Sequence, residues 1–292
     1  AKDLEDLASR LKGTIYSDAV SRVSKPYNAE KFEMAFREYL AAMHNALIYV
    51  TPKPDLLISY YLKHIVWDLK VVLKGKALGM SYDEIVHHVN LYAEELAGRR
   101  DLVIKALSAK DLDEAIGLLR GSEFGDDIYS AVKLYRSKKD IQILDTYIDR
   151  ALFKSLVSSY HKLRKAGRRR GSPDAGRVRG MVAVDVDSYN VISLLRAKLW
   201  DLTPSQTRDL IIEPTFEIPR RKLEALISAG SIGEAVKHLA GTPYRRIIPA
   251  GVSEEEAIPK LEAGFELMCY NEALKTFLWQ VYGMGVVLGI VK

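Results

Sequence analysis

One cysteine and no long apolar run limit what this chain can be. Cys269 is the only cysteine among the 292 residues, so no intrachain disulfide and no multi-cysteine zinc site can form. No uninterrupted apolar run reaches the roughly 18–20 residues that a membrane span needs. The nearest candidate, residues 277–291, contains Gln280 and three glycines, and we predict a buried segment there. The first ten residues are charged and helical in pattern, which is unlike a signal peptide.

The sequence also lacks the motifs of common catalytic sites. Gly75-Lys76 has neither the preceding glycine nor the following hydroxyl residue of a phosphate-binding loop, and there is no Gly-x-Ser-x-Gly elbow. His64 and Asp68 have the spacing of neighbours on a helix, which we interpret as a solvated or helix-stabilising pair. Asp185 and Asp187 resemble a paired-carboxylate site, but we favour acids at a helix N-terminus. We therefore expect no enzyme, no cofactor and no metal, although a site assembled from distant residues stays open.

Helical periodicity dominates the sequence. Residues 4–11 place apolar side chains at the i, i+3, i+4 and i+7 spacing of one helix face. Residues 181–186 give a weak strand signal and lead into a helical pattern. The patterns predict an all-α protein with long helices over residues 140–164 and 260–282.

Two helix starts carry capping chemistry. Ser81 is followed three residues later by Glu84, and Thr203 by Gln206. At this spacing the hydroxyl accepts a hydrogen bond from a free amide of the first helical turn, while the longer side chain reaches back. We therefore expect helices to begin at both positions.

Comparison of the chain with itself shows a repeated pattern. Residues 112–124 and 232–244 both contain an acid, an alanine and an aliphatic residue, followed by leucine, glycine, a hydroxyl residue and an aromatic residue. Residues 16–27 hold a fainter copy that is one residue shorter. Any one of these matches could be chance similarity between amphipathic helices.

Two further patterns recur in the same order. An apolar residue followed by an acid opens a long amphipathic helix after each copy, at Phe32, Leu144 and Leu261. Residues 68–74 match residues 190–196 and precede the two later copies. Three patterns in one order favour a duplicated helical unit of about 115–120 residues, too long for a tetratricopeptide or HEAT repeat. The unit is present twice in full and once in part.

These ordered patterns carry a resemblance that covers essentially the whole chain. The aliphatic helix of residues 185–198, the Thr-Pro-Tyr turn of residues 242–244 and the Leu-Glu helix start at residue 261 are the quoted matches. The chain resembles the C subunit of the archaeal A-type ATP synthase, a relative of the d subunit of vacuolar ATPases. Two departures stand out, because the family usually has a further helix before residue 2 and continues past residue 289 into another.

The resemblance implies three similar helical subdomains in a funnel with pseudo-threefold symmetry. We expect them at residues 1–52, 53–170 and 171–282, with residues 283–292 completing the first. The resemblance also implies a non-catalytic rotor protein on the cytoplasmic face of the membrane. Its expected partners are the D and F subunits of the central stalk and the proteolipid ring, and its expected role is torque transmission in ATP synthesis coupled to H⁺ or Na⁺ flow.

A basic cluster is the strongest competing signal. Residues 154–180 hold nine Lys or Arg against one acid, and residues 162–179 are rich in Gly, Ser and Pro, which predicts a loop between modules. The loop would bind nucleic-acid phosphates, anionic lipid headgroups or an acidic partner, or be a solvated loop. A helical nucleic-acid-binding protein is thus the alternative function, but no aromatic residue lies in 162–179 for base stacking. The candidate partner-binding residues are Arg164, Lys165, Arg168, Arg169, Arg170, Arg177 and Arg179.

Overall fold

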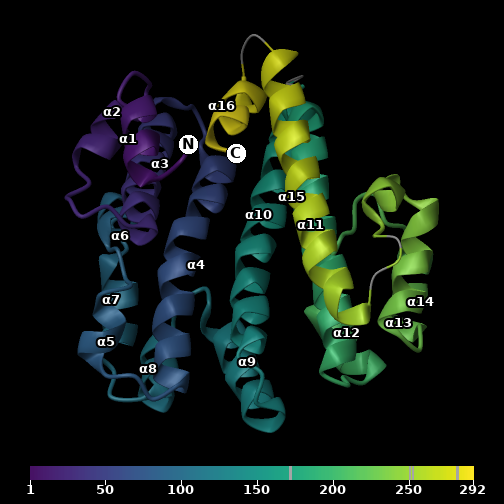
Figure 1. Ribbon diagram of the computed structural model, residues 1–292. Helices are drawn as coiled ribbons and strands as arrows, with labels where there is room; N and C mark the ends of the chain where they lie inside the picture. The colour runs from purple at the N-terminus through teal and green to yellow at the C-terminus, as the bar shows by residue number, and fades with distance from the viewer. Residues whose placement is uncertain (171–172, 250, 252, 281–282) are drawn as a thin grey trace. The chain divides into compact units, whose positions relative to one another are not determined.

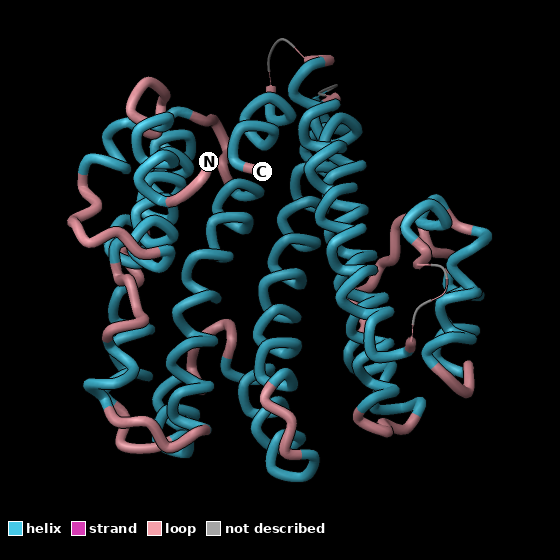
Figure 2. The backbone as a smooth tube through the Cα atoms, in the orientation of Figure 1, coloured by secondary structure: helices cyan, strands magenta, loops and turns pink. Residues whose placement is uncertain are grey.

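Every regular element that the structure describes is a helix, which confirms the all-α class (Figures 1 and 2). The structure is a computed structural model and describes residues 1–170, 173–249, 251, 253–280 and 283–292. The chain divides into a first unit, residues 1–122 with Val291, and a second unit, residues 123–290 with Lys292. The funnel with three subdomains stays a prediction.

The first unit packs short helices around two long ones (Figure 1). Apolar side chains surround α4 on almost every side, and Leu57, Ile65 and Leu69 are fully buried. A helix that is apolar all round must be enclosed by others, and α3, α5, α6, α7 and α8 all contact it. The helices are α1 (Leu4–Leu11), α2 (Ser17–Ser21), α3 (Ala29–Val50), α4 (Asp55–Ala77), α5 (Tyr82–Val86), α6 (Tyr92–Leu96), α7 (Arg100–Ser108) and α8 (Leu112–Leu119).

The second unit has α11 at its centre, between α10 and α15 (Figure 1). Most residues of α11 are buried, including residues 181–186, where burial on all sides explains the run of valines without a strand. The helices are α9 (Gly125–Lys138), α10 (Gln142–Arg170), α11 (Asp174–Leu199), α12 (Pro204–Leu210), α13 (Arg220–Ser228), α14 (Ile232–Lys237), η1 (His238–Gly241), η2 (Pro243–Ile247), α15 (Glu254–Leu278) and α16 (Met284–Val291). The predicted long helices are thus present as α10 and α15, with other bounds. Tyr282, the predicted end of the second, lies outside the described residues.

The same capping bonds recur in both units. Ser81 and Thr203 each form a complete capping box, at the start of α5 and of α12. Asp111 caps α8 and Ser231 caps α14, each by accepting a hydrogen bond from the amide three residues later. The sequence repeat therefore corresponds to a repeat in local structure.

One long-range hydrogen bond is also repeated, with different chemistry in each copy. The side chain of Asp68 on α4 accepts a hydrogen bond from the amide of Asn90, 22 residues later, at 3.4 Å. The side chain of Asn190 on α11 accepts one from the amide of Ile212, also 22 residues later, at 2.8 Å. Asn190 additionally donates to the Ile212 carbonyl at 3.0 Å, which a carboxylate cannot do. The second copy thus uses a neutral amide where the first uses an acid.

The structure corrects the interpretation of Asp185 and Asp187. The helix that carries them begins at Asp174, so both lie inside α11 and are buried, rather than at a helix N-terminus. Asp187 accepts hydrogen bonds from two backbone amides, those of Phe216 and Glu217, and from the Tyr244 hydroxyl at 2.9 Å. Buried donors supplied by a later loop, and not the helix dipole, hold this carboxylate.

Asp185 has a different set of partners. Its carboxylate accepts from the Lys292 ammonium at 2.6 Å and from the Cys269 thiol at 3.2 Å. Burial, followed by the charge of Asp185, raises the pKa of the Cys269 thiol far above its usual range. Asp185 and Asp187 therefore have separate structural roles and do not form a paired-carboxylate site.

The apolar segment 277–291 is only partly buried, contrary to expectation. Met284 and Leu288 of α16 are buried, but Phe277, Leu278 and Trp279 at the end of α15 are exposed. No helix in the described part of the chain is both long enough and apolar enough to cross a bilayer.

Candidate functional site

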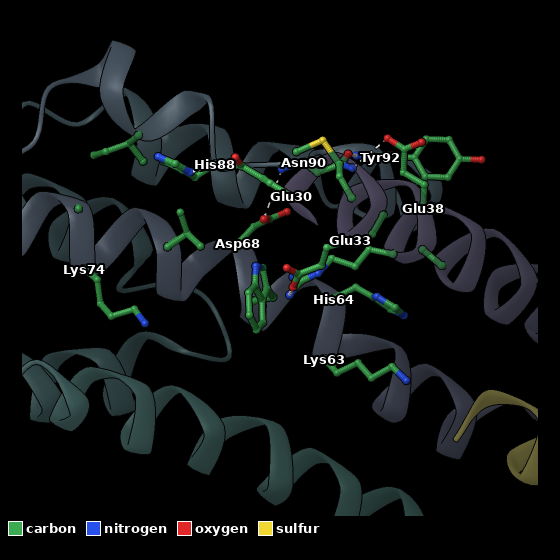
Figure 3. Close-up of a pocket in the computed structure, with 18 of the residues that line it drawn as sticks. Glu30, Glu33, Glu38, Lys63, His64, Asp68, Lys74, His88, Asn90 and Tyr92 are labelled. Atoms are coloured by element: carbon green, nitrogen blue, oxygen red, sulfur yellow. Dashed lines mark hydrogen bonds and ion pairs between the residues drawn. The ribbon is translucent and has the colours of Figure 1, made fainter. Parts of the chain in front are cut away.

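A cavity of about 630 Å³ lies within the first unit (Figure 3). Its walls come from α3, α4 and the segment from α5 to α6. Much of the lining is aliphatic, from side chains such as Met34, Val71 and Ile85, and charged side chains from α3 and α4 also line it. Concave sites of this size and composition are typical places for a ligand or a partner side chain to bind.

Two acids meet beside this cavity. Asp68 lines it and Glu94 is fully buried on the neighbouring helix α6. Burial raises the pKa of Asp68 to about 6, and burial followed by the charge of Asp68 raises the pKa of Glu94 to about 8. Among the described residues, neither side-chain oxygen of Glu94 has a hydrogen-bonding partner. The pair therefore holds a proton at pH values where exposed acids have lost theirs.

Two histidines meet between α3 and α4. The His44 ring packs edge-on against Tyr61 at 5.1 Å between centroids and lies 6.0 Å from the His64 ring. Burial, and then the charge of Lys63, lowers the pKa of His44 to about 4 and of His64 to about 3. Both rings are therefore neutral near pH 7, and His44 donates its Nε2 hydrogen to the Leu57 carbonyl at 3.0 Å.

These positions correct the interpretation of His64 and Asp68 as a solvated pair. Asp68 is buried, the pKa of His64 is depressed by burial, and the Asn90 amide donates a hydrogen bond to Asp68. The sequence placed the two residues on neighbouring turns of one helix. It gave no sign of Glu94, because nothing in the local pattern around residue 94 marks a buried acid.

The rim of the cavity contains ion pairs and an exposed tryptophan. The Arg37 guanidinium lies over the Trp67 ring, 3.3 Å from its centroid, and also pairs with Glu33. Glu30 pairs with His88, and Glu38 accepts a hydrogen bond from the Asn90 side chain. These three carboxylates at the rim thus have hydrogen-bonding partners within the unit. No cluster of three or more metal-ligating side chains occurs in the described ranges.

The basic segment is helical, where a loop over residues 162–179 was predicted. α10 continues to Arg170 and α11 begins at Asp174, because arginine and lysine favour helix and the Gly167 position is buried against neighbours. Gly171 and Ser172 lie outside the described residues, as do the side chains of Arg169 and Arg170.

The remaining predicted residues of the basic segment do not form one site. Arg164, Lys165 and Arg168 are exposed on α10. Arg177 is half-buried, and Arg179 pairs with Glu217. The structure therefore leaves three predicted residues together on one exposed helix and gives Arg179 an internal partner.

Comparison with known proteins accounts for the whole length of the chain. The family model of the ATP synthase (C/AC39) subunit matches residues 1–292. The chain belongs to the ATP synthase (C/AC39) subunit family. Members of this family are structural and not catalytic parts of ATP synthase.

Individual members of the C/AC39 family are distant in sequence. The C subunit of the A-type ATP synthase of Methanocaldococcus jannaschii is 25% identical over 72% of this chain, and the match spans about half, 52%, of that relative. The corresponding protein of Methanococcoides burtonii is 23% identical over 97% of this chain and 76% of its own length. That of Methanosphaera stadtmanae is 22% identical over the full chain and 73% of its own length.

Proposed function

We propose that this chain couples the central stalk of an A-type ATP synthase, through the D and F subunits, to the proteolipid ring. It would transmit torque at the cytoplasmic face of the membrane without bond chemistry of its own. The match of the C/AC39 family over residues 1–292 is the observation that carries the proposal.

The helical architecture supports a mechanical role. α10, α11 and α15 contain 29, 26 and 25 residues, and α11 packs along both of the others. Side-by-side helices of this length resist bending because each restrains its neighbours through a close-packed interface. A torque-transmitting protein needs that stiffness.

An exposed apolar stripe on α15 offers a surface for a helical partner. Leu267, Tyr270 and Leu274 are exposed and follow one another at intervals of three and four residues. This is the spacing of a coiled-coil seam, which matches another helix and not a flat or irregular surface. We assign the stripe to a helix of a stalk protein.

The test is capture of the folded chain by purified D and F subunits and, separately, by the proteolipid ring. Leu267→Asp should weaken capture by D and F at least tenfold, because it places a charge in the seam. Leu199→Asp is the matched control, since Leu199 is an equally exposed leucine at the end of α11. Failure of the wild-type chain to bind either partner, with its helical content intact, would refute the proposal. If both substitutions weakened capture by D and F equally, the stripe would not be the surface that binds the stalk proteins.

A further inference from the structure

The second unit has one end where three helix termini meet. In the contacts between α11 and α15, residue numbers fall along α11 as they rise along α15. Arg196 pairs with Glu262, Asp185 contacts Cys269, and Gly180 approaches Glu272. α15 is therefore antiparallel to α11, and its last turn lies at the same end as the start of α11 and the finish of α10 (Figure 1).

A further contact connects the next helix to the same end. The Met284 amide at the start of α16 donates to the Asp174 carboxylate at 3.4 Å. Asp174 is the first residue of α11 and the one acid within residues 154–180. The acid nearest the basic cluster in sequence is thus engaged by the protein itself.

The cations at this end share one side of a helix. Arg164, Lys165 and Arg168 stand at i, i+1 and i+4 on α10, so their side chains lie within about 100° of one another around the axis. All three are exposed, and no acidic residue occurs from Lys162 to Arg168. The last turns of α10 therefore present a positive face to the surroundings.

An exposed indole accompanies these charges. Trp279, directly after α15, is 84% exposed. Of the other two tryptophans, Trp200 is buried and donates to Asp140 at 2.9 Å, and Trp67 is 48% exposed with the Arg37 guanidinium over its ring. An indole left in water is unfavourable, whereas the boundary between lipid headgroups and acyl chains suits its apolar body and its single N–H donor.

We propose that this end of the second unit binds the surface of an anionic lipid bilayer, with Arg164, Lys165 and Arg168 on the headgroup phosphates and Trp279 at the headgroup–acyl boundary. Basic residues and an exposed tryptophan at one end of a protein are the combination that peripheral membrane-binding segments use. An acidic protein would explain the charges but not the tryptophan. A nucleic acid would need aromatic residues among the cations, and residues 162–179 contain none. The inference goes beyond the proposed coupling role.

The size of the effect follows from the charge count. A basic residue near an anionic membrane surface strengthens partitioning by about fivefold, so removal of three should weaken it by roughly 100-fold. Screening acts over about 10 Å at 0.1 M salt, so binding should also fall steeply as salt is added.

Sedimentation with phosphatidylcholine vesicles, with or without phosphatidylglycerol, measures this binding directly. The wild-type chain should sediment with the phosphatidylglycerol vesicles and not with the neutral ones. The triple variant Arg164→Ala, Lys165→Ala, Arg168→Ala should lose roughly 100-fold in partition coefficient. The matched control removes Arg220, Arg221 and Arg245, three exposed arginines elsewhere in the second unit, and should bind like the wild type.

A second measurement needs no charge variant. Bromine-labelled lipids quench only tryptophans that enter the bilayer, so they should quench wild-type fluorescence and leave Trp279→Phe unaffected. Equal losses in both triple variants, equal binding to neutral vesicles, or absence of quenching would overturn the proposal. The proposal would also be overturned if the chain bound RNA but not vesicles, and if the first triple variant abolished that RNA binding. None of these results depends on capture by the stalk proteins or the ring, so the coupling role is tested separately.

Discussion

Replacement of Asp68 by asparagine should stabilise the first unit at alkaline pH and leave it nearly unchanged at mildly acidic pH. Asp68 and Glu94 are buried together, and burial raises both pKa values above the ordinary values near 4. A carboxyl of this kind stabilises the fold while it is protonated. Its contribution is full below the unfolded-state pKa and is lost as the pH rises through the folded-state value.

The magnitude follows from proton linkage. Each pH unit over which the folded unit holds one extra proton costs about 1.4 kcal/mol of stability, so two units cost about 3 kcal/mol. Asparagine carries no titrating proton, can donate to Glu94, and is the residue that the second unit uses at Asn190. We therefore expect Asp68→Asn to be more stable than the wild type by about 2 kcal/mol at pH 8 and equal near pH 4.

Hydrogen exchange followed by mass spectrometry can separate the two units. Comparison of variant and wild type at the same pH cancels the intrinsic pH dependence of exchange. Amides of α4 in Asp68→Asn should exchange about 30-fold more slowly than in the wild type at pH 8, and at the same rate near pH 4. Amides of α11 serve as the internal control and should not change. A destabilisation at pH 8, or a difference of equal size at both pH values, would refute the raised pKa of Asp68.

The other predictions concern single buried groups. Asn190→Asp should destabilise the second unit by about 1–3 kcal/mol, and by more as the pH rises, because a carboxylate cannot donate to the Ile212 carbonyl. Urea unfolding at pH 5 and pH 8 measures this loss of stability. Asp187→Ala should cost about 3 kcal/mol by leaving two amides and the Tyr244 hydroxyl without their acceptor, and an unchanged urea midpoint would contradict this role. His64→Gln should resist acid better than the wild type, because the depressed pKa of His64 makes wild-type stability fall as the pH drops below about 6.5. Equal thermal midpoints in the two proteins between pH 4 and pH 6 would argue against this prediction.

Local patterns in the sequence predicted the helices well. The two predicted capping boxes follow from short-range chemistry, because the residues that form each box lie within four positions of one another. The extension of α10 to Arg170 was missed, because the glycine and proline near that point suggested a loop. Gly167 is a buried position within α10, and Pro173 stands just before the next helix, where proline is tolerated.

The candidate sites depended on distant contacts that the sequence does not display. Asp68 and Glu94 are 26 positions apart, and only the packing of α6 on α4 brings them together. Likewise, the donors that hold Asp187 come from a loop 29 and 30 residues later and from Tyr244. Local spacing therefore suggested a solvated or helix-stabilising pair at His64 and Asp68, and helix-terminal acids at Asp185 and Asp187. Burial in the tertiary structure gives the acids of both pairs other environments.

The antiparallel packing of α11 and α15 has a mechanical consequence. The Arg196–Glu262 ion pair and the Asp185–Cys269 contact lie at different levels along the same interface. A force directed along the helix axes loads all such contacts at once, in shear, whereas a force across them breaks the contacts one after another, from one end. The second unit should thus resist lengthwise pulling far better than sideways peeling, and the direction in which a partner pulls would determine whether the unit holds or opens.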